Sequence, residues 1–287
     1  MSAWGNNWPT ISGPVENATL RYISFGAGVQ STTLLLAADR GDVGPKPDCA
    51  IMSDTGWEPR KVYNHLEWLR DRVSIPIYTT SAGNLRDAIM ANAKHGTRTA
   101  AVPWFLIGEG NSRKLGKGMR TCTADYKIVP VIKKARELLG IAPGARVPKG
   151  VIVEQWIGIS TDEMERMKAS PKPWIVNRFP LIEAGISRQK CIEWMAERQF
   201  SAPKSSCVGC PFHANSEWRD LRDNSPEEWA DAVAVDHALR DNTKSRIRAL
   251  QFMHKSRVPL DQANIDDDDD RQGVFGFKNE CEGMCGV

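Results

Sequence analysis

The sequence lacks a long apolar run and carries little net charge. No segment approaches the ~20 consecutive apolar residues that a membrane-spanning helix needs, and residues 1–9 show neither the basic nor the apolar stretch of a secretory signal. We therefore expect a cytoplasmic protein with reduced cysteines and no membrane partner. The 38 Lys and Arg residues against 35 Asp and Glu give a net charge of +3, which excludes a uniformly basic nucleic-acid coat protein.

What is present is typical of an ordinary globular protein. The 287 residues are 41% hydrophobic and 25% charged, which predicts a large domain with a substantial core, with room for a smaller appendage. The seven cysteines are odd in number and clustered towards the end of the chain. Composition alone does not explain them.

Apolar strand patterns alternate with helical patterns along the first two thirds of the chain. Strands are predicted at 20–26, 49–53, 75–79 and 151–159, and helices at 31–40, 58–72 and 128–139. This alternation predicts an α/β fold, with an open, mostly parallel sheet and flanking helices. Ligands bind beyond the carboxyl ends of such strands, where residues 26–31, 54–56 and 160–163 would meet.

Three regions are predicted along the chain. Residues 1–18 form an extended leader, residues 19–200 form a nucleotide-binding domain, and residues 201–287 form a cysteine-bearing C-terminal extension. Near the end of the nucleotide-binding domain, Ser187 is predicted to cap a helix, and in the extension a further helix is predicted near 226–240.

The segment from Ser24 to Thr32 lies between a predicted strand and a predicted helix. Its small residues allow backbone amides to approach a phosphate, and the helix N-terminus favours negative charge. Ser31 and Thr32 could add hydroxyl donors. A plain strand-to-helix turn is the alternative. A Walker A loop is excluded, because Gly-x-x-x-x-Gly-Lys-Ser/Thr does not occur.

This loop resembles the PP-loop, Ser-Gly-Gly-x-Asp-Ser, of the adenine nucleotide alpha hydrolase superfamily, in its phosphoadenosine-phosphosulfate-reductase-like branch. Residues 53–59 (Ser-Asp-Thr-Gly-Trp-Glu-Pro) are similar to that branch's Asp-Thr-Gly segment, and residues 120–130 to its Arg-x-Cys-Thr…Lys-Ile-x-Pro segment. Residues 158–163 are similar to a fourth motif, with Ser160 where the branch often has arginine. The resemblance covers roughly residues 20–215. Ala27 replaces a glycine and Gln30 replaces the acid.

The resemblance implies a PP-loop (HUP-type) fold that binds ATP or a related adenine nucleotide, with magnesium as a further candidate. Lys127 would act as a catalytic cation near phosphate or sulfate. For Asp54, capping of the following helix is the alternative. The implied nucleotide-binding residues are Ser24, Gly26, Ala27, Gly28, Gln30, Ser31, Thr32, Asp54, Thr55, Gly56 and Arg120.

Cys207 and Cys210 are two residues apart, a spacing that suits one metal centre. The resemblance implies a [4Fe-4S] cluster on Cys122, Cys207 and Cys210, with Cys285 or Cys281 as the fourth ligand. Zinc on Cys207, Cys210, Cys281 and Cys285 is an alternative, and so is the absence of metal. The tail around Cys281 faintly resembles the Glu-Cys-Gly tail of sulfonucleotide reductases, which makes Cys281 and Cys285 candidate nucleophiles.

Cys49 and Cys191 lie in apolar surroundings, where buried thiols are expected. Residues 94–136 hold ten Lys and Arg residues against two acids. This stretch predicts a flexible phosphate-binding loop that could contact nucleic acid. A solvated basic face is the alternative.

The leading hypothesis is adenine-nucleotide-dependent sulfur chemistry. In it, ATP activates a nucleic-acid or nucleoside acceptor, and sulfur is delivered with the help of an iron–sulfur cluster and a sulfur-donor or thiol redox protein. The second hypothesis is an adenylyl or phosphoadenylyl sulfate reductase that produces sulfite. The third is a non-catalytic nucleotide- or nucleic-acid-binding component of a larger complex.

Overall fold

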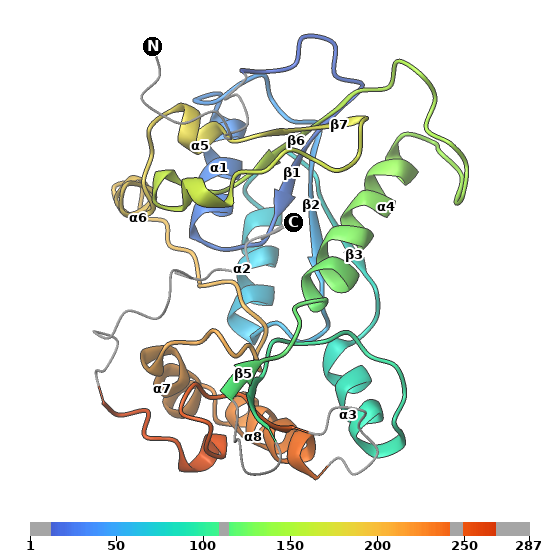
Figure 1. Cartoon of the computed structure of the whole chain (residues 1–287). Coiled ribbons are helices and arrows are strands. Elements are labelled where there is room, and N and C mark those ends of the chain that lie inside the picture. The colour runs from blue at the N-terminus through green and yellow to red at the C-terminus, as the bar shows by residue number, and fades with distance from the viewer. Residues whose placement is uncertain (1–12, 109–114, 242–248, 268–287) are drawn as a thin grey trace.

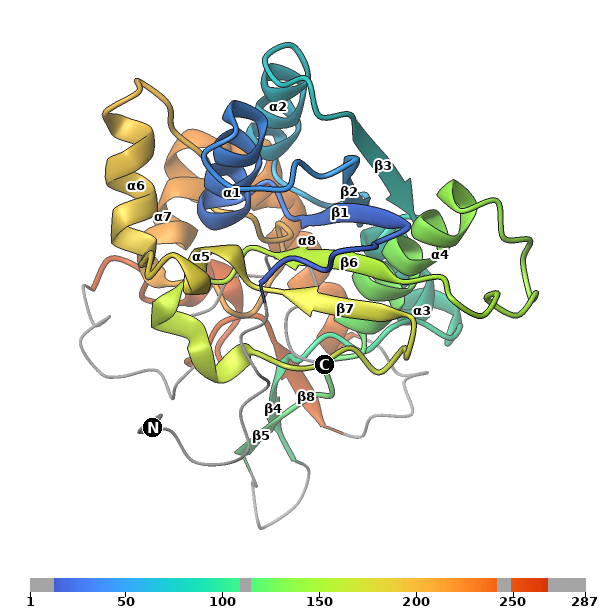
Figure 2. The same cartoon turned by 90° about the horizontal axis from the view of Figure 1, so that it is seen from above.

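A five-stranded sheet forms the centre of the chain (Figures 1 and 2). The computed structural model describes residues 13–108, 115–241 and 249–267. The strands are ordered β3-β2-β1-β6-β7 and every neighbouring pair is parallel, so the predicted α/β fold is confirmed. Their bounds are β1 Leu20–Phe25, β2 Cys49–Asp54, β3 Ile77–Ser81, β6 Val153–Ile157 and β7 Ile175–Arg178.

Side chains alternate between the two faces of the sheet, and each face is covered by helices (Figure 2). Ile23 and Phe25 pack in one cluster with α1, α2 and α6, whereas Tyr22 packs on the other face against Val131 and Ala135 of α4. The helices are α1 Val29–Arg40, α2 Arg60–Arg70, α4 Val129–Leu138, α5 Pro180–Glu183 and α6 Arg188–Ala196. Cys49 and Cys191 are buried in these two clusters, as predicted.

The helix boundaries follow local signals. Gly41 ends α1 in the left-handed conformation, with φ of 83°. The Ser187 side chain accepts a hydrogen bond from the Lys190 amide at the start of α6. Asp54 does not cap α2, because the residue before that helix is Pro59.

A second group of elements lies below the carboxyl ends of the parallel strands in Figure 1. It contains an antiparallel sheet ordered β5-β4-β8. Around this sheet a separate hydrophobic cluster includes Trp104, Trp218 and Val235. Its strands and helices are β4 Phe105–Ile107, β5 Leu115–Lys117, β8 Leu250–Phe252, α3 Leu85–His95, α7 Asn215–Asn224 and α8 Pro226–Arg240.

The basic stretch 94–136 is more ordered than a flexible loop. Its described residues include β4, β5, the π-helical turn η1 (Ala124–Ile128) and most of α4. Because β4 pairs with β8, this stretch shares a sheet with the C-terminal extension. Two 3-10 turns complete the described structure: η2 (Thr161–Arg166) and η3 (Leu260–Gln262). None of the helices in the described ranges is long and apolar enough to cross a membrane.

Candidate functional site

The loop between β1 and α1 has the tight geometry of a strand-to-helix turn. Gly28 precedes α1, and its amide donates to Ser31 Oγ at 3.2 Å. Ala27 is buried and has φ of 58°, a left-handed conformation that favours glycine. A Cβ on Gly158, just after β6, would lie 2.9 Å from Ser31 Cα. The loop and the end of β6 are therefore in direct backbone contact.

Gln30 lies in the first turn of α1 and is fully buried. Its Nε2 donates to Glu163 Oε2 at 3.1 Å, and its Oε1 accepts from Arg188 Nη1 at 2.8 Å. Glu163 also pairs with Arg166. The Gln30 amide thus holds a carboxylate from η2 at the start of α1.

One pocket opens at the carboxyl ends of β1 and β2, and we call it the strand-end pocket. Its wall contains two buried oxygen atoms that lack a hydrogen-bond partner in the described structure, Ser24 Oγ and Glu58 Oε2. A buried polar atom without a partner is costly, so these two atoms favour a polar ligand there. The lining residues are Ser24, Phe25, Gly26, Met52, Ser53, Glu58, Lys127, Val131 and Ser205.

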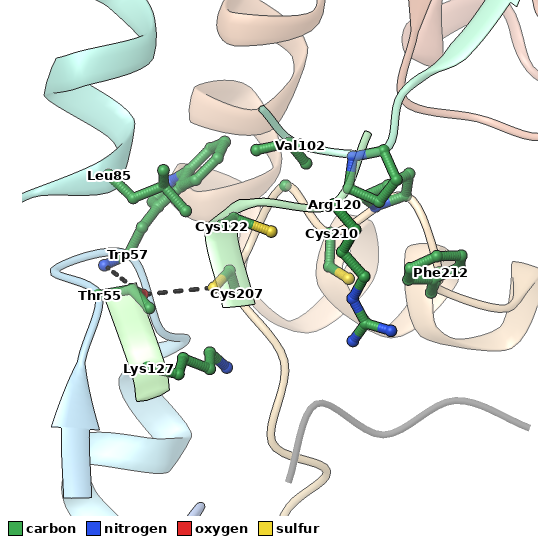
Figure 3. A pocket seen from close by; sticks show the side chains of 13 residues that line it. Thr55, Trp57, Leu85, Val102, Arg120, Cys122, Lys127, Cys207, Cys210 and Phe212 are labelled. Carbon is green, nitrogen blue, oxygen red and sulfur yellow. Dashed lines mark hydrogen bonds between the residues drawn. The ribbon is translucent and has the colours of Figure 1, made fainter. Parts of the chain in front are cut away.

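A second pocket, the cysteine pocket, adjoins the first (Figure 3). The sulfur atoms of Cys122, Cys207 and Cys210 lie close to it in the close-up view. Lys127 lines both pockets, so one ammonium group separates the strand ends from the three thiols. The lining residues are Thr55, Trp57, Leu85, Val102, Pro103, Arg120, Cys122, Lys127, Cys207, Gly209, Cys210, Pro211 and Phe212.

Glu58 joins the two pockets. Its Oε1 accepts from the Thr55 hydroxyl at 3.0 Å and lies 3.6 Å from Lys127 Nζ. The Cys207 thiol donates to the same oxygen at 3.5 Å. Both members of the Glu58–Lys127 ion pair are buried, where charges interact more strongly than in water.

The loop carrying Cys207 and Cys210 is fixed from behind. The Val208 amide donates to the Trp57 carbonyl at 2.8 Å, and a Cβ on Gly209 would lie only 2.2 Å from the Trp57 ring. His213 Nε2 donates to the Cys207 carbonyl at 2.9 Å. Burial lowers the pKa of His213, so this histidine is a neutral hydrogen-bond donor that supports the loop.

The donor chemistry of the cysteine pocket suits a soft metal or an iron–sulfur cluster, since three thiols reach one cavity. Within the described residues, however, no group of three or more His, Cys, Asp or Glu side chains is arranged to hold a metal ion. Cys281 and Cys285, the predicted fourth ligands and nucleophiles, lie outside the described residues.

The structure brings only some of the predicted residues to the two pockets. Ser24, Gly26 and Lys127 line the strand-end pocket, and Thr55, Arg120 and the three thiols line the cysteine pocket. The Thr32 hydroxyl bonds instead to His65 Nε2 at 3.0 Å, inside the helix layer. The residues that line neither pocket are Ala27, Gly28, Gln30, Ser31, Thr32, Asp54 and Gly56.

Asp54 organises the turn after β2. Its Oδ1 accepts from the Gly56 amide at 2.7 Å and from the Tyr63 hydroxyl at 2.8 Å. Burial and the Asp54 carboxylate raise the pKa of Tyr63, so the phenol stays a proton donor. Asp54 thereby shapes the turn that presents Thr55 and Glu58.

Glu58 and Phe212 are among the lining residues that had no predicted role. Glu58 lies within the Asp-Thr-Gly segment, but its position between two pockets depends on Lys127 and Cys207, which are remote in sequence. Phe212 follows the Cys-x-x-Cys-Pro segment, and Arg120 lies 5.1 Å above its ring. In the sequence, the proline and the aromatic residue that directly follow Cys210 were the only pattern that could have pointed to Phe212 as a pocket residue.

Comparisons with known proteins give a structural likeness. No protein-family model and no curated protein matches the chain. Among solved structures, the chain is similar to the crystal structure of phosphoadenylyl-sulfate (PAPS) reductase from Candida auris in its phosphate complex. The sequence identity is 13% and the TM-score is 0.40, over 63% of this chain and 74% of that chain.

Proposed function

We propose that this protein binds an adenine nucleotide in the strand-end pocket and uses it in sulfur chemistry carried out at the cysteine pocket. The observation that carries the proposal is the position of Lys127, which lines both pockets. A cation there can stabilise negative charge as it develops on a phosphate or sulfate group. The Lys127 ammonium group would then lie between the bound nucleotide and the thiols of the cysteine pocket.

ATP is the nucleotide that the loop favours. Cleavage of a phosphoanhydride commonly needs a carboxylate to hold magnesium, as well as cations to neutralise the phosphates. Glu163, Arg166 and Arg188 provide both kinds of charge beside Gln30, at the first turn of α1 and outside the lining of the strand-end pocket. This arrangement supports ATP-dependent activation of an acceptor despite the loss of the acid from the loop itself.

A [4Fe-4S] cluster would be held by Cys122, Cys207 and Cys210, with Cys281 or Cys285 as the fourth ligand. When bound, such a cluster would supply sulfur or electrons for the transfer. Anaerobically purified protein should then be brown and contain iron and sulfide. Colourless protein without iron refutes the cluster, and protein containing zinc supports the alternative site on Cys207, Cys210, Cys281 and Cys285.

The experiment that separates the candidate functions compares ATP with sulfonucleotides on the same anaerobic preparation. Release of pyrophosphate from ATP that depends on an added acceptor supports sulfur transfer. Release of sulfite from a sulfonucleotide, abolished by Cys281→Ser or Cys285→Ser, supports the reductase. Nucleotide binding without either product supports a non-catalytic component.

Lys127→Met tests the role of the shared cation. We expect a loss of turnover of roughly 100-fold, the size of effect seen when one preorganised charge-stabilising group is removed. Lys133→Met is the matched control, because Lys133 is exposed on α4 nearby. Equal activity of the two variants contradicts the proposed role of Lys127.

A further inference from the structure

Two cations flank one aromatic ring on the small antiparallel sheet. Lys117 Nζ of β5 lies 5.0 Å from the centre of the Phe105 ring, and the Arg257 guanidinium lies 5.5 Å from the same ring. Phe105 is buried on β4, the middle strand. Because β4 pairs with both β5 and β8, the sheet brings together cations that are 140 residues apart in sequence.

The backbone holds Arg257 in this position. Its Nε donates to the Leu106 carbonyl at 3.2 Å, and its Nη2 donates to the Gly116 carbonyl at 3.5 Å. Arg257 itself has φ of 57°, a left-handed conformation that costs roughly 1–2 kcal/mol for a residue with a Cβ. The guanidinium is therefore fixed across β4 and β5 rather than extended into solvent.

Among the described residues, no acidic side chain neutralises these two charges. In the part of the chain that the structure describes, neither Lys117 nor Arg257 forms an ion pair with an Asp or Glu. Burial and the nearby Arg257 charge lower the pKa of Lys117. The repulsion that Lys117 experiences from Arg257 destabilises the folded protein, and a bound anion would relieve it.

Arg120 extends this group of cations to the wall of the cysteine pocket. Lys117 Nζ also lies 5.3 Å from the centre of the Phe212 ring, over which Arg120 stacks. Figure 3 shows Arg120 and Phe212 on the same side of the pocket as Cys210. The cations thus lead from the small sheet to the thiols, on the side of Lys127 away from the strand-end pocket.

We propose that Lys117 and Arg257, together with Arg120, bind a phosphate group of the acceptor substrate. The assignment of this phosphate to the acceptor substrate rests on the proposed function, whereas the proposal that these cations bind a phosphate group does not. The phosphate can belong to a mononucleotide or to a polynucleotide backbone, because both present the same anionic oxygens to lysine and arginine.

Binding of a labelled single-stranded 12-mer, followed by fluorescence anisotropy, and of a nucleoside monophosphate, followed by calorimetry, tests the inference. Lys117→Gln and Arg257→Gln should each weaken binding at least about fivefold, and should lower the salt dependence of 12-mer binding by about one ion. The matched control is Arg72→Gln. Arg72 follows α2, outside the small antiparallel sheet, and stacks on Trp68 at 4.4 Å.

The two probes identify the source of the phosphate. Weakened binding of the 12-mer alone indicates a polynucleotide, and weakened binding of both probes indicates a nucleotide-sized ligand. The inference is overturned if wild-type protein binds neither probe, if the two variants bind like wild type, or if Arg72→Gln weakens binding equally. ATP binding measured on the same samples distinguishes the two proposals. If the proposed function is wrong, wild-type protein does not bind ATP, whereas the loss of phosphate binding in the Lys117 and Arg257 variants is still expected.

Discussion

Replacing Gln30 with glutamate should destabilise this protein. In wild type, Gln30 Nε2 donates to Glu163 Oε2 at 3.1 Å inside the core. Gln30→Glu replaces this donor with a second carboxylate. A hydrogen bond to a charged acceptor contributes roughly 1.5–3 kcal/mol, and two buried carboxylates in contact repel unless one of them takes up a proton.

Arg188 offsets part of this loss, because its Nη1 lies 2.8 Å from Gln30 Oε1 and would gain a charged partner. We therefore expect Gln30→Glu to lower the free energy of unfolding by about 2–3 kcal/mol at pH 8. The repulsion raises the pKa of one carboxyl group in the folded variant. Folded protein then holds a proton that unfolded protein releases, so the variant's stability falls as pH rises and the loss is smaller at pH 5.

Urea denaturation at pH 5, 6.5 and 8 measures these differences. Gln189→Glu is the matched control, because Gln189 Nε2 donates to Glu193 at 3.0 Å on the exposed surface of α6, where the change should cost less than about 0.5 kcal/mol. The double variant Gln30→Glu/Glu163→Gln exchanges the amide and the acid and should recover most of the stability. A Gln30→Glu protein as stable as wild type at pH 8, or a loss independent of pH, refutes the reasoning.

Three further predictions concern stability. Gly209→Ala places a Cβ 2.2 Å from the Trp57 ring; it should cost about 1–3 kcal/mol and change the rate at which a thiol reagent labels the cysteine pocket, and unchanged labelling would contradict this. Ala27→Gly removes the strain of φ 58° and should raise the urea midpoint by the equivalent of about 0.5–1 kcal/mol; a lower midpoint would count against it. Burial lowers the pKa of His65 and of His254 to about 4, so unfolded protein binds more protons below pH 6.5 and thermal stability should fall as pH drops from 6.5 towards 4; a melting temperature constant over that range would show the shifts to be absent.

Elements with strong local signals were predictable from the sequence. The helix α8 runs from Pro226 to Arg240, as predicted, because Pro226 and two acids mark its first turn. The loop after β1 and the left-handed Gly41 at the end of α1 were equally local. The alternation of strands and helices was sufficient to predict the parallel sheet.

The remaining features depend on contacts between distant residues. Each strand of the small sheet has three residues, too few to show a periodicity, and β4 pairs Leu106 with Gln251, which lies 145 residues later. Gln30 and Glu163 meet across 133 residues. No local pattern identifies such partners, so the Gln30–Glu163 contact and the two cations beside Phe105 become visible only in the folded chain.

The shared Lys127 makes the two pockets thermodynamically linked. An anion in the strand-end pocket competes with Glu58 for the same ammonium group, and Glu58 is also the acceptor for the Cys207 thiol. Occupancy of the strand-end pocket therefore changes the electrostatic surroundings of Cys207. Linkage is reciprocal: whatever factor an anion in the strand-end pocket applies to binding at the thiols, a ligand at the thiols applies to the binding of that anion. The order in which ligands enter the two pockets therefore affects how fast both pockets become occupied. The total free energy of filling both pockets is the same for either order.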